Sequence, residues 1–403
     1  MILNYISIEY IILNLIIIFL FYLDVKSRHN FFQIQNYKLI KSIYKKTNFK
    51  LFIEYITKCI FQKKINNNFI KNDHPFLSIC ICTYNSEEYI QKAILSIINQ
   101  SFQDFEIIIV NDNSNDKTYE VLIKLQKRDE RIKIINHSKN LGAYHSRAEG
   151  VLNSKSKYIL FLDPYDLLFN PFLFEEIYKS YLKYNLDIIE FTVFYLKQNN
   201  KVFYINRQIY NHYHNFTKKI IYQPELSNIL YYKPNSKNYS TIICRPLWNK
   251  IIKRNILLKT IKYIGNSYYN DYYIIVTEDA LLNIIIYNFA NNYTNLNLPG
   301  YLYNIRNSSI THTINNDILI KKSISFFLFY LLFYRLIKDF DKDRNYLYFD
   351  LRLFGRFILN LKKINNTFFL NKAKIMFNEI LNDNKTSKEF KNYIKFSYKS
   401  ILK

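Results

Sequence analysis

The chain is poor in cysteine, and after its N-terminal segment it has no long apolar run. Four cysteines in 403 residues exclude a disulfide scaffold. Cys80 and Cys82 lie two positions apart in an apolar run, so they share one face of a strand and we expect them to be packing residues. The later apolar run, residues 324–334, is too short to span a bilayer, which excludes a protein with many membrane spans.

Acidic residues are also scarce: the chain has 32 Asp and Glu but 56 Lys and Arg, which gives a net charge of +24. Such an excess is typical of proteins that bind nucleic acid. However, the lysines are spread along the chain, and neither a zinc-finger nor an RNA-binding signature is present. Anionic lipid head groups or a nucleotide diphosphate explain the charge equally well, and we expect no nucleic-acid partner. The histidines lack the spacing of metal ligands.

Residues 2–23 form the one apolar run long enough to cross a membrane, and Glu9 is its only charged residue. We therefore predict a single-pass transmembrane anchor over residues 1–24. A cleaved signal peptide would need a basic start and a small-residue cleavage site, and both are missing. A buried core helix is the remaining alternative.

Lys and Arg crowd residues 26–72, directly after the anchor, so we interpret residues 25–74 as a basic stalk. The positive-inside rule places this flank, and the domain behind it, on the cytoplasmic side, with a Golgi or ER lumen as the alternative. We predict one folded domain at residues 75–313, which divides into two halves, 75–190 and 191–313. Residues 314–403 are predicted to form a helical C-terminal extension.

Three apolar runs between residues 77 and 166 each end in polar residues. Buried parallel strands have this continuous apolar pattern, and ligands bind beyond their carboxyl ends. We expect a first strand that begins at residue 77 and closes within 82–85, and further strands at 105–110, 131–136, 158–162 and 186–194. Helices are expected near 90–98, 121–125, 143–153 and 171–184. Ser86 is the expected cap of the first helix. Strands that alternate with helices predict a mostly parallel, mixed α/β sheet flanked by helices.

Five motifs then occur in order, and together they resemble the family 2 glycosyltransferases, which have the Rossmann-like GT-A fold. They are Cys82–Asn85, Ser96–Phe102, Val110–Ser114, Asn140–Gly142 with Arg147 and Gly150, and Phe161–Asp166. Weaker similarity continues at Leu247–Lys250, Thr277–Asp279 and Tyr301–Ile310. The resemblance implies an enzyme that makes glycosidic bonds from a nucleotide-sugar donor, here expected to be a UDP-sugar.

The resemblance also implies site residues. Those expected to bind the nucleotide are Thr83, Tyr84, Asn85, Asp112, Arg147 and Asp163. Asp112 would accept a hydrogen bond from the base. Asp163 and Asp166 would hold a divalent metal, Mn²⁺ or Mg²⁺, that bridges the diphosphate. Such a hard cation with oxygen ligands would compensate the charge of the leaving group.

The chain departs from the family pattern at Tyr165, where the family has a third Asp. A phenol is a weak metal ligand at neutral pH. Simpler structural roles also exist for the acids: Asp112 could cap the turn after its strand, and Asp163 and Asp166 could begin a helix before Pro171. Trp248, the only Trp, is more typical of a core than of an acceptor platform.

An inverting transfer needs a base within reach of the acceptor hydroxyl. Glu278 and Asp279 open an apolar stretch, 280–290, that predicts a helix, and acids at a helix start are favourable even without a function. The resemblance implies Asp279 as the catalytic base and Glu278 as its support.

The leading hypothesis is a membrane-anchored inverting glycosyltransferase with a glycan or lipid-linked acceptor. The alternatives are a catalytically silent relative that keeps the nucleotide pocket, a basic nucleic-acid-binding protein, and another nucleotidyl-transfer enzyme on a similar sheet.

Overall fold

The structure is a computed structural model that describes residues 72–196, 202–203, 220–223, 246–265 and 278–306. It also describes single positions at 325, 374–375, 378, 381–382, 391–392 and 395. The predicted anchor, nearly all of the basic stalk and most of the C-terminal extension lie outside these residues. Within them, no helix is long and apolar enough to cross a membrane.

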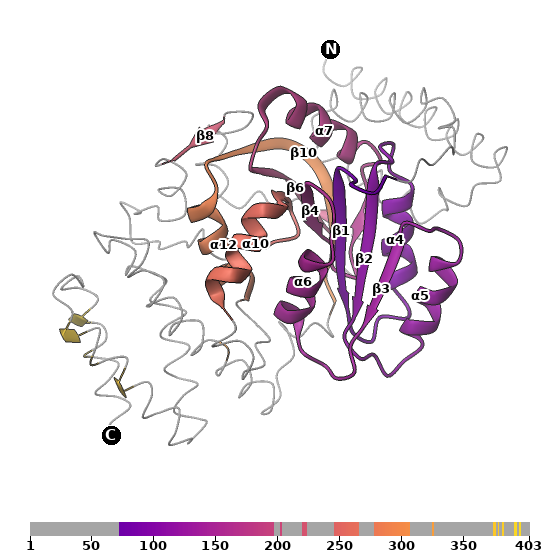
Figure 1. Cartoon of the computed structure of the whole chain (residues 1–403), viewed down its shortest axis with the longest axis horizontal. Coiled ribbons are helices and arrows are strands. Elements are labelled where there is room, and N and C mark those ends of the chain that lie inside the picture. Colours follow the sequence, from indigo (N-terminus) through magenta and orange to yellow (C-terminus); the bar gives the residue numbers. More distant parts are fainter. Residues whose placement is uncertain are drawn as a thin grey trace, which may run out of the picture. The chain divides into compact units, whose positions relative to one another are not determined.

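The first half of the sheet is parallel and forms the core of the described chain (Figure 1). Strand β1 (Leu77–Thr83) pairs in parallel with β2 (Phe105–Asn111) and with β4 (Tyr158–Phe161), and β2 pairs with β3 (Ile132–Asn136). Every residue of β2 and β4 is buried. This is the expected result for strands that read as continuous apolar runs.

Beyond β4 the sheet contains antiparallel pairs, so the prediction of a mostly parallel sheet holds only up to β4. The strand order is β3-β2-β1-β4-β9-β6-β10-β5. Strand β9 (Lys250–Lys253) runs antiparallel to both β4 and β6 (Ile188–Leu196). The other strands on this side are β5 (Leu167–Leu168), β8 (Ile221–Tyr222) and β10 (Asn292–Asn304). The insertion of β9 between β4 and β6 joins segments about 90 residues apart in sequence, which no local pattern specifies.

Helices cover both faces of the sheet. In Figure 1, α4 (Ile90–Ile98) and α5 (Thr118–Gln126) lie on one side of β1–β3, and α6 (Ala143–Leu152) lies on the other. Helix α6 packs closely on β1 at Gly150, where the absence of a side chain allows the approach. A Cβ at this position would lie only 3.2 Å from the sulfur of Cys80. The remaining helices are α7 (Leu173–Tyr184), α10 (Arg254–Ile264) and α12 (Glu278–Phe289), and α10 packs on both α6 and α12. The helices predicted at 143–153, 171–184 and 280–290 are thus confirmed.

The caps differ from the sequence predictions. Helix α4 begins at Ile90 after a turn in which the Ser86 carbonyl accepts hydrogen bonds from the Tyr89 and Ile90 amides. The Ser86 hydroxyl contacts Thr83 instead of capping the helix. Before α7, the Asn170 side chain accepts a hydrogen bond from the Phe172 amide. The interpretation of Asp163 and Asp166 as helix caps is therefore wrong.

The described residues divide into two compact units. In the smaller one, β7 (Val202–Phe203) pairs antiparallel with the end of β6, and Tyr195 lies 5.5 Å from Tyr303 between ring centroids. The larger unit contains the parallel strands, the helices and all the residues predicted to form the site.

Candidate active site

The candidate site is assembled from the loops that follow β1, β2 and β4, from α6 and from the start of α12. Two of these loops turn through asparagines with positive φ, 50° at Asn85 and 60° at Asn113, a conformation that Asn tolerates better than other non-glycine residues. The Asn85 side-chain oxygen accepts a hydrogen bond from the Asn115 backbone amide at 2.8 Å, and the Asn85 backbone amide donates to Ser114 Oγ. The loops after β1 and β2 are thus bonded to each other.

The predicted nucleotide residues of the β1 loop differ in exposure. The Thr83 side chain is buried against Ser86, whereas Tyr84 is 42% exposed. Of the two, only the ring of Tyr84 is available for stacking on a planar base.

Asp112 is buried, and its carboxylate joins three elements. Oδ1 accepts the Leu141 amide at 2.8 Å, and Oδ2 accepts the Gly142 amide at 2.7 Å. His137, just after β3, places Nδ1 2.8 Å from Oδ1. Asp112 therefore anchors the entry to α6 and does not cap the turn after its own strand. Its role toward a nucleotide base stays a prediction. Sequence reasoning missed His137, although its place after a parallel strand links it to this edge.

Arg147, in the middle of α6, forms the centre of the site. Nη1 lies 3.0 Å from Glu278 Oε1 and 3.0 Å from Asp279 Oδ1, and Nη2 lies 3.7 Å from Asp163 Oδ1. We call these four residues the Arg147 cluster. The fold therefore brings the predicted donor-side acid and the predicted base to one guanidinium, although they are more than 100 positions apart in sequence.

The Arg147 cluster has one positive charge among three carboxyl groups. This imbalance, together with burial, shifts the pKa values of Arg147 and Glu278. Burial by itself lowers the pKa of Arg147, but the charges of Asp279, Glu278 and Asp163 outweigh it and raise this pKa well above its ordinary value. Burial and the charge of Asp279 raise the pKa of Glu278, against the attraction of Arg147. Burial also raises the pKa of the nearby Cys82 thiol to about 12, so it is inert as a nucleophile at neutral pH.

Asp166 faces a buried tyrosine that the sequence did not identify as part of the site. The Tyr301 hydroxyl donates to Asp166 Oδ2 at 2.8 Å and accepts from the Asp163 amide at 3.2 Å. Tyr301 also stacks on Trp248, with ring centroids 4.4 Å apart. Burial and the charge of Asp166 raise the pKa of this phenol well above its ordinary value. Trp248 is buried, which agrees with its predicted core role. The side chain of Lys250 is buried too, and it donates to the Pro246 carbonyl.

The donor set does not fit the divalent metal that the resemblance implies. Asp166 is 2% exposed and receives a hydrogen bond from Tyr301. The Tyr165 hydroxyl donates to the Tyr84 carbonyl at 3.1 Å, and its ring packs against Tyr89. This leaves the Asp163 carboxylate, at 36% exposure, as the accessible oxygen ligand of the segment. Over the part of the chain that the structure describes, no three ligand side chains gather to hold a metal ion.

Residues 78–257 match the sequence model of glycosyl transferase family 2. An uncharacterised glycosyltransferase of Haemophilus influenzae is 42% identical over 93 residues, which are 23% of this chain and 29% of that protein. GalNAc(5)-diNAcBac-PP-undecaprenol beta-1,3-glucosyltransferase of Campylobacter jejuni is 40% identical over 95 residues, 23% of this chain and 31% of that protein. The chain thus spans less than a third of either relative.

Among solved structures, S. aureus TarS 1–349 in complex with UDP-GlcNAc is 17% identical. That match covers 81% of this chain and 92% of the TarS chain, with a TM-score of 0.45, too low to carry an argument. The match to the family model spans β1 to β9 and therefore includes Asp112, Arg147 and Asp163, whereas Glu278 and Asp279 lie beyond it. Residues 78–257 thus match glycosyl transferase family 2, and this match covers less than half of the chain.

Proposed function

We propose that the protein is an inverting glycosyltransferase that moves a sugar from a nucleotide-sugar donor, a UDP-sugar, to a glycan or lipid-linked acceptor. The observation that carries the proposal is the Arg147 cluster. It places Asp163, which follows β4, and Asp279, which begins α12, within 4 Å of one guanidinium. A donor-side acid and a candidate base at one point are what a single displacement at an anomeric carbon requires.

In this proposal Asp279 takes the proton of the acceptor hydroxyl while that oxygen forms the new glycosidic bond and the nucleoside diphosphate leaves. One side chain oxygen, Oδ2, lies 3.4 Å from the Leu247 amide, which fixes the carboxylate at the start of α12. Tyr84 and Asn85 would border the base, and Asp112 would hold the loop before α6 in place. No step passes through a metal, since the described donor set does not fit one.

The lipid-linked acceptor draws on the name of the Campylobacter jejuni relative, which states an undecaprenol-linked substrate. An anchor at residues 1–24 and the basic stalk would hold the domain at a membrane surface, on the cytoplasmic side. Deletion of residues 1–24 should then move the protein from the membrane fraction to the soluble fraction. Recovery of the intact chain as a soluble protein at low salt would contradict the anchor.

The test of the activity begins with donor binding. UDP-glucose, UDP-galactose and UDP-GlcNAc are compared by thermal shift, and the donor with the largest shift is incubated with undecaprenyl-diphosphate-linked and free glycan acceptors. We expect transfer with inverted anomeric configuration, read by NMR of the product. Retained configuration would remove Asp279 as the base of a single displacement.

A second candidate, a silent nucleotide-binding relative, is favoured by one observation, the Tyr165 hydroxyl bonded to the Tyr84 carbonyl. Tyr165 thereby occupies the rim of the proposed base pocket. Donor binding without turnover for any acceptor would support this candidate over the enzyme.

A further inference from the structure

Three large apolar side chains are exposed at the edge of the sheet opposite the candidate site. Leu152 ends α6 and is 53% exposed, and Leu182 and Tyr184, in the last turn of α7, are 65% and 44% exposed. Helix α6 leads into β4, and α7 leads into β6. These two strands run in the same direction, because each pairs antiparallel with β9. Both helix ends therefore lie at the amino ends of the strands.

Lysines are interspersed among these apolar side chains. Lys155 and Lys157, in the loop before β4, and Lys183, beside Tyr184, are all exposed. Lys157 Nζ donates a hydrogen bond to the Tyr181 hydroxyl at 2.6 Å. Lys183 Nζ lies 4.8 Å from the centroid of the Tyr184 ring. The cations and the apolar side chains thus belong to one surface.

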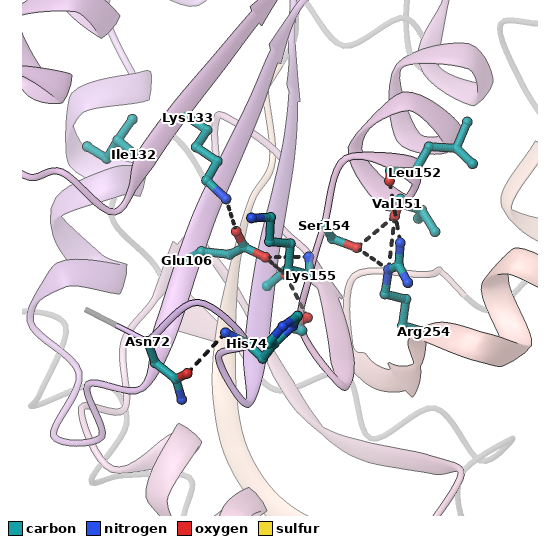
Figure 2. A network of polar contacts seen from close by, with 12 residues as sticks. Asn72, His74, Glu106, Ile132, Lys133, Val151, Leu152, Ser154, Lys155 and Arg254 are labelled. Atoms are coloured by element: carbon teal, nitrogen blue, oxygen red, sulfur yellow. Dashed lines mark hydrogen bonds and ion pairs between the residues drawn. The ribbon is translucent and has the colours of Figure 1, made fainter. Parts of the chain in front are cut away.

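Arg254, at the start of α10, connects the two helix ends. Its backbone amide donates to the Lys157 carbonyl at 2.9 Å, and its Nη2 donates to the Leu152 carbonyl at 3.4 Å. Figure 2 shows Arg254 bonded to the end of α6. Contacts therefore continue from Leu152 through Arg254, Lys157 and Tyr181 to the neighbouring Leu182. We define the amino-edge patch as Leu152, Lys155, Lys157, Leu182, Lys183 and Tyr184.

The acids next to the amino-edge patch compensate little of its charge. Glu106 and Asp187 are buried, and each pairs with a lysine outside the patch. Glu149, one turn before the end of α6, is partly exposed and offsets one positive charge. The three lysines of the patch therefore leave it positively charged.

We infer that the amino-edge patch is the face by which the domain lies on a membrane that contains anionic lipids. Exposed leucines and a tyrosine can enter the head-group region, and the lysines among them attract anionic head groups. The Lys- and Arg-rich residues 26–72 lead into the domain at this same edge, where Asn72, before β1, donates to Asp104, before β2. The inference rests on the membrane location in the proposed function, to which it adds the face of the domain and the lipid chemistry.

Docking through this patch would leave the candidate site open. The Arg147 cluster lies at the carboxyl ends of the strands, and a seven-residue strand such as β1 spans roughly 20 Å. A bilayer against the amino-edge patch would therefore not cover the site, which stays accessible to a nucleotide-sugar from solution.

The experiment is hydroxyl-radical footprinting of the full-length protein in phosphatidylcholine vesicles, with and without phosphatidylglycerol. Flotation first measures whether the chain is bound to the vesicles. The oxidation rates of Leu182 and Tyr184 are then compared with those of Leu95 and Tyr119. These two controls are exposed residues of the same types, on α4 and α5, away from the patch.

Phosphatidylglycerol should lower the oxidation rates of Leu182 and Tyr184 about threefold or more, because these side chains enter the head-group region. The rates of Leu95 and Tyr119 should stay unchanged. High salt should restore fast oxidation of the patch, since it screens the lysines from the lipid head groups.

Charge reversal provides a second measurement. The double variant Lys157→Glu, Lys183→Glu should lose the protection of the patch in anionic vesicles. The double variant Lys92→Glu, Lys124→Glu is the matched control, because it makes the same change in net charge at exposed positions of α4 and α5, and it should keep the protection. Thermal melting checks that both variants are folded. If the patch variant does not fold, the lipid and salt comparisons on the wild type decide.

Three results would overturn the docking role. Equal protection without phosphatidylglycerol would assign the patch to another contact, such as a second copy of the chain. Unprotected Leu182 and Tyr184 in a chain that floats with anionic vesicles would show that the patch faces water. Equal loss of protection in the two charge variants would show that net charge is responsible, and not the patch. A chain that floats with neither kind of vesicle would instead refute the proposed membrane location, and the docking with it. None of these readouts depends on transferase activity.

Discussion

Two acidic clusters lie at opposite edges of the same parallel strands, and they satisfy their charges very differently. At the amino end of β2, Glu106 accepts hydrogen bonds from Ser78 Oγ at 2.6 Å, Lys133 Nζ at 2.5 Å and the Lys155 amide at 2.8 Å. Figure 2 shows the bonds from Lys133 and Lys155. We call this the Glu106 cluster. At the carboxyl ends of the strands, the Arg147 cluster sets one guanidinium against three carboxyl groups.

The pKa shifts of the two buried glutamates have opposite signs for this reason. At Glu106 burial alone would raise the pKa, but the hydrogen bonds of Lys133, Ser78 and Lys155 outweigh it and the pKa falls. At Glu278 the effects of burial and of the neighbouring Asp279 outweigh the attraction of Arg147, and the pKa rises. A structural cluster compensates its charge within the fold, whereas a binding site keeps charge that a substrate or a proton must compensate.

The largest expected difference between the edges is in catalysis. Asp279→Asn should lower the rate of transfer by about 10²–10⁴-fold, because an amide cannot take the hydroxyl proton. Glu106→Gln, the matched carboxyl-to-amide change at the other edge, should leave the rate nearly unchanged. Steady-state kinetics with the same donor and acceptor check both. Equal losses in the two variants would show that the edges do not differ in function.

The next effect is on stability at the structural edge. Glu106→Gln should lower the free energy of unfolding by about 1–3 kcal/mol at neutral pH, because the acceptor of these hydrogen bonds loses its negative charge. Since the folded-state pKa of Glu106 is depressed, this stability is present above the unfolded pKa and is lost as the pH falls through the folded pKa. Urea unfolding at neutral and at acidic pH should therefore show a difference between wild type and variant that shrinks in acid.

Glu278→Gln should show the opposite pH dependence. The folded-state pKa of Glu278 is raised, so the folded protein binds this proton more tightly than the unfolded chain. The stability of the wild type then falls as the pH rises from the unfolded pKa to the folded one. Over this pH range the melting temperature of the variant should therefore rise relative to that of the wild type. A variant that loses stability relative to wild type as the pH rises would contradict the uncompensated character of the cluster.

The smallest effect concerns the metal. Mn²⁺ or a chelator should change the donor affinity of the wild type little, because Asp166 and Tyr165 are held by Tyr301 and the Tyr84 carbonyl. Tyr165→Asp should make donor binding more sensitive to the chelator by adding a carboxylate next to Asp163. Calorimetry with and without chelator measures both, and Tyr165→Phe is the control for loss of the hydroxyl. Strong chelator sensitivity in the wild type would show that the segment binds metal despite these contacts.

The sequence by itself determined the main strands and helices between residues 77 and 194, the helix after Glu278, and the edge of the sheet at which the chemistry lies. Continuous apolar runs favour buried strands, and parallel strands place their polar ends together, so the amino-acid pattern alone assigns Asp112 and Asp163 to one edge of the sheet. The helices that begin at Ala143 and Glu278 followed from spacing and from acids in a first turn.

Only the tertiary structure decided which side chains meet. Periodicity fixes the face of a strand or helix, but it carries no information about partners that are distant in sequence. The antiparallel insertion of β9, the bonds of Asp112 to the entry of α6, and the contact of Tyr301 with Asp166 all depend on packing between distant segments. The meeting of Arg147 with Asp163 and Asp279 is of the same kind: the charges are evident in the sequence, and their imbalance appears only where the fold buries them together.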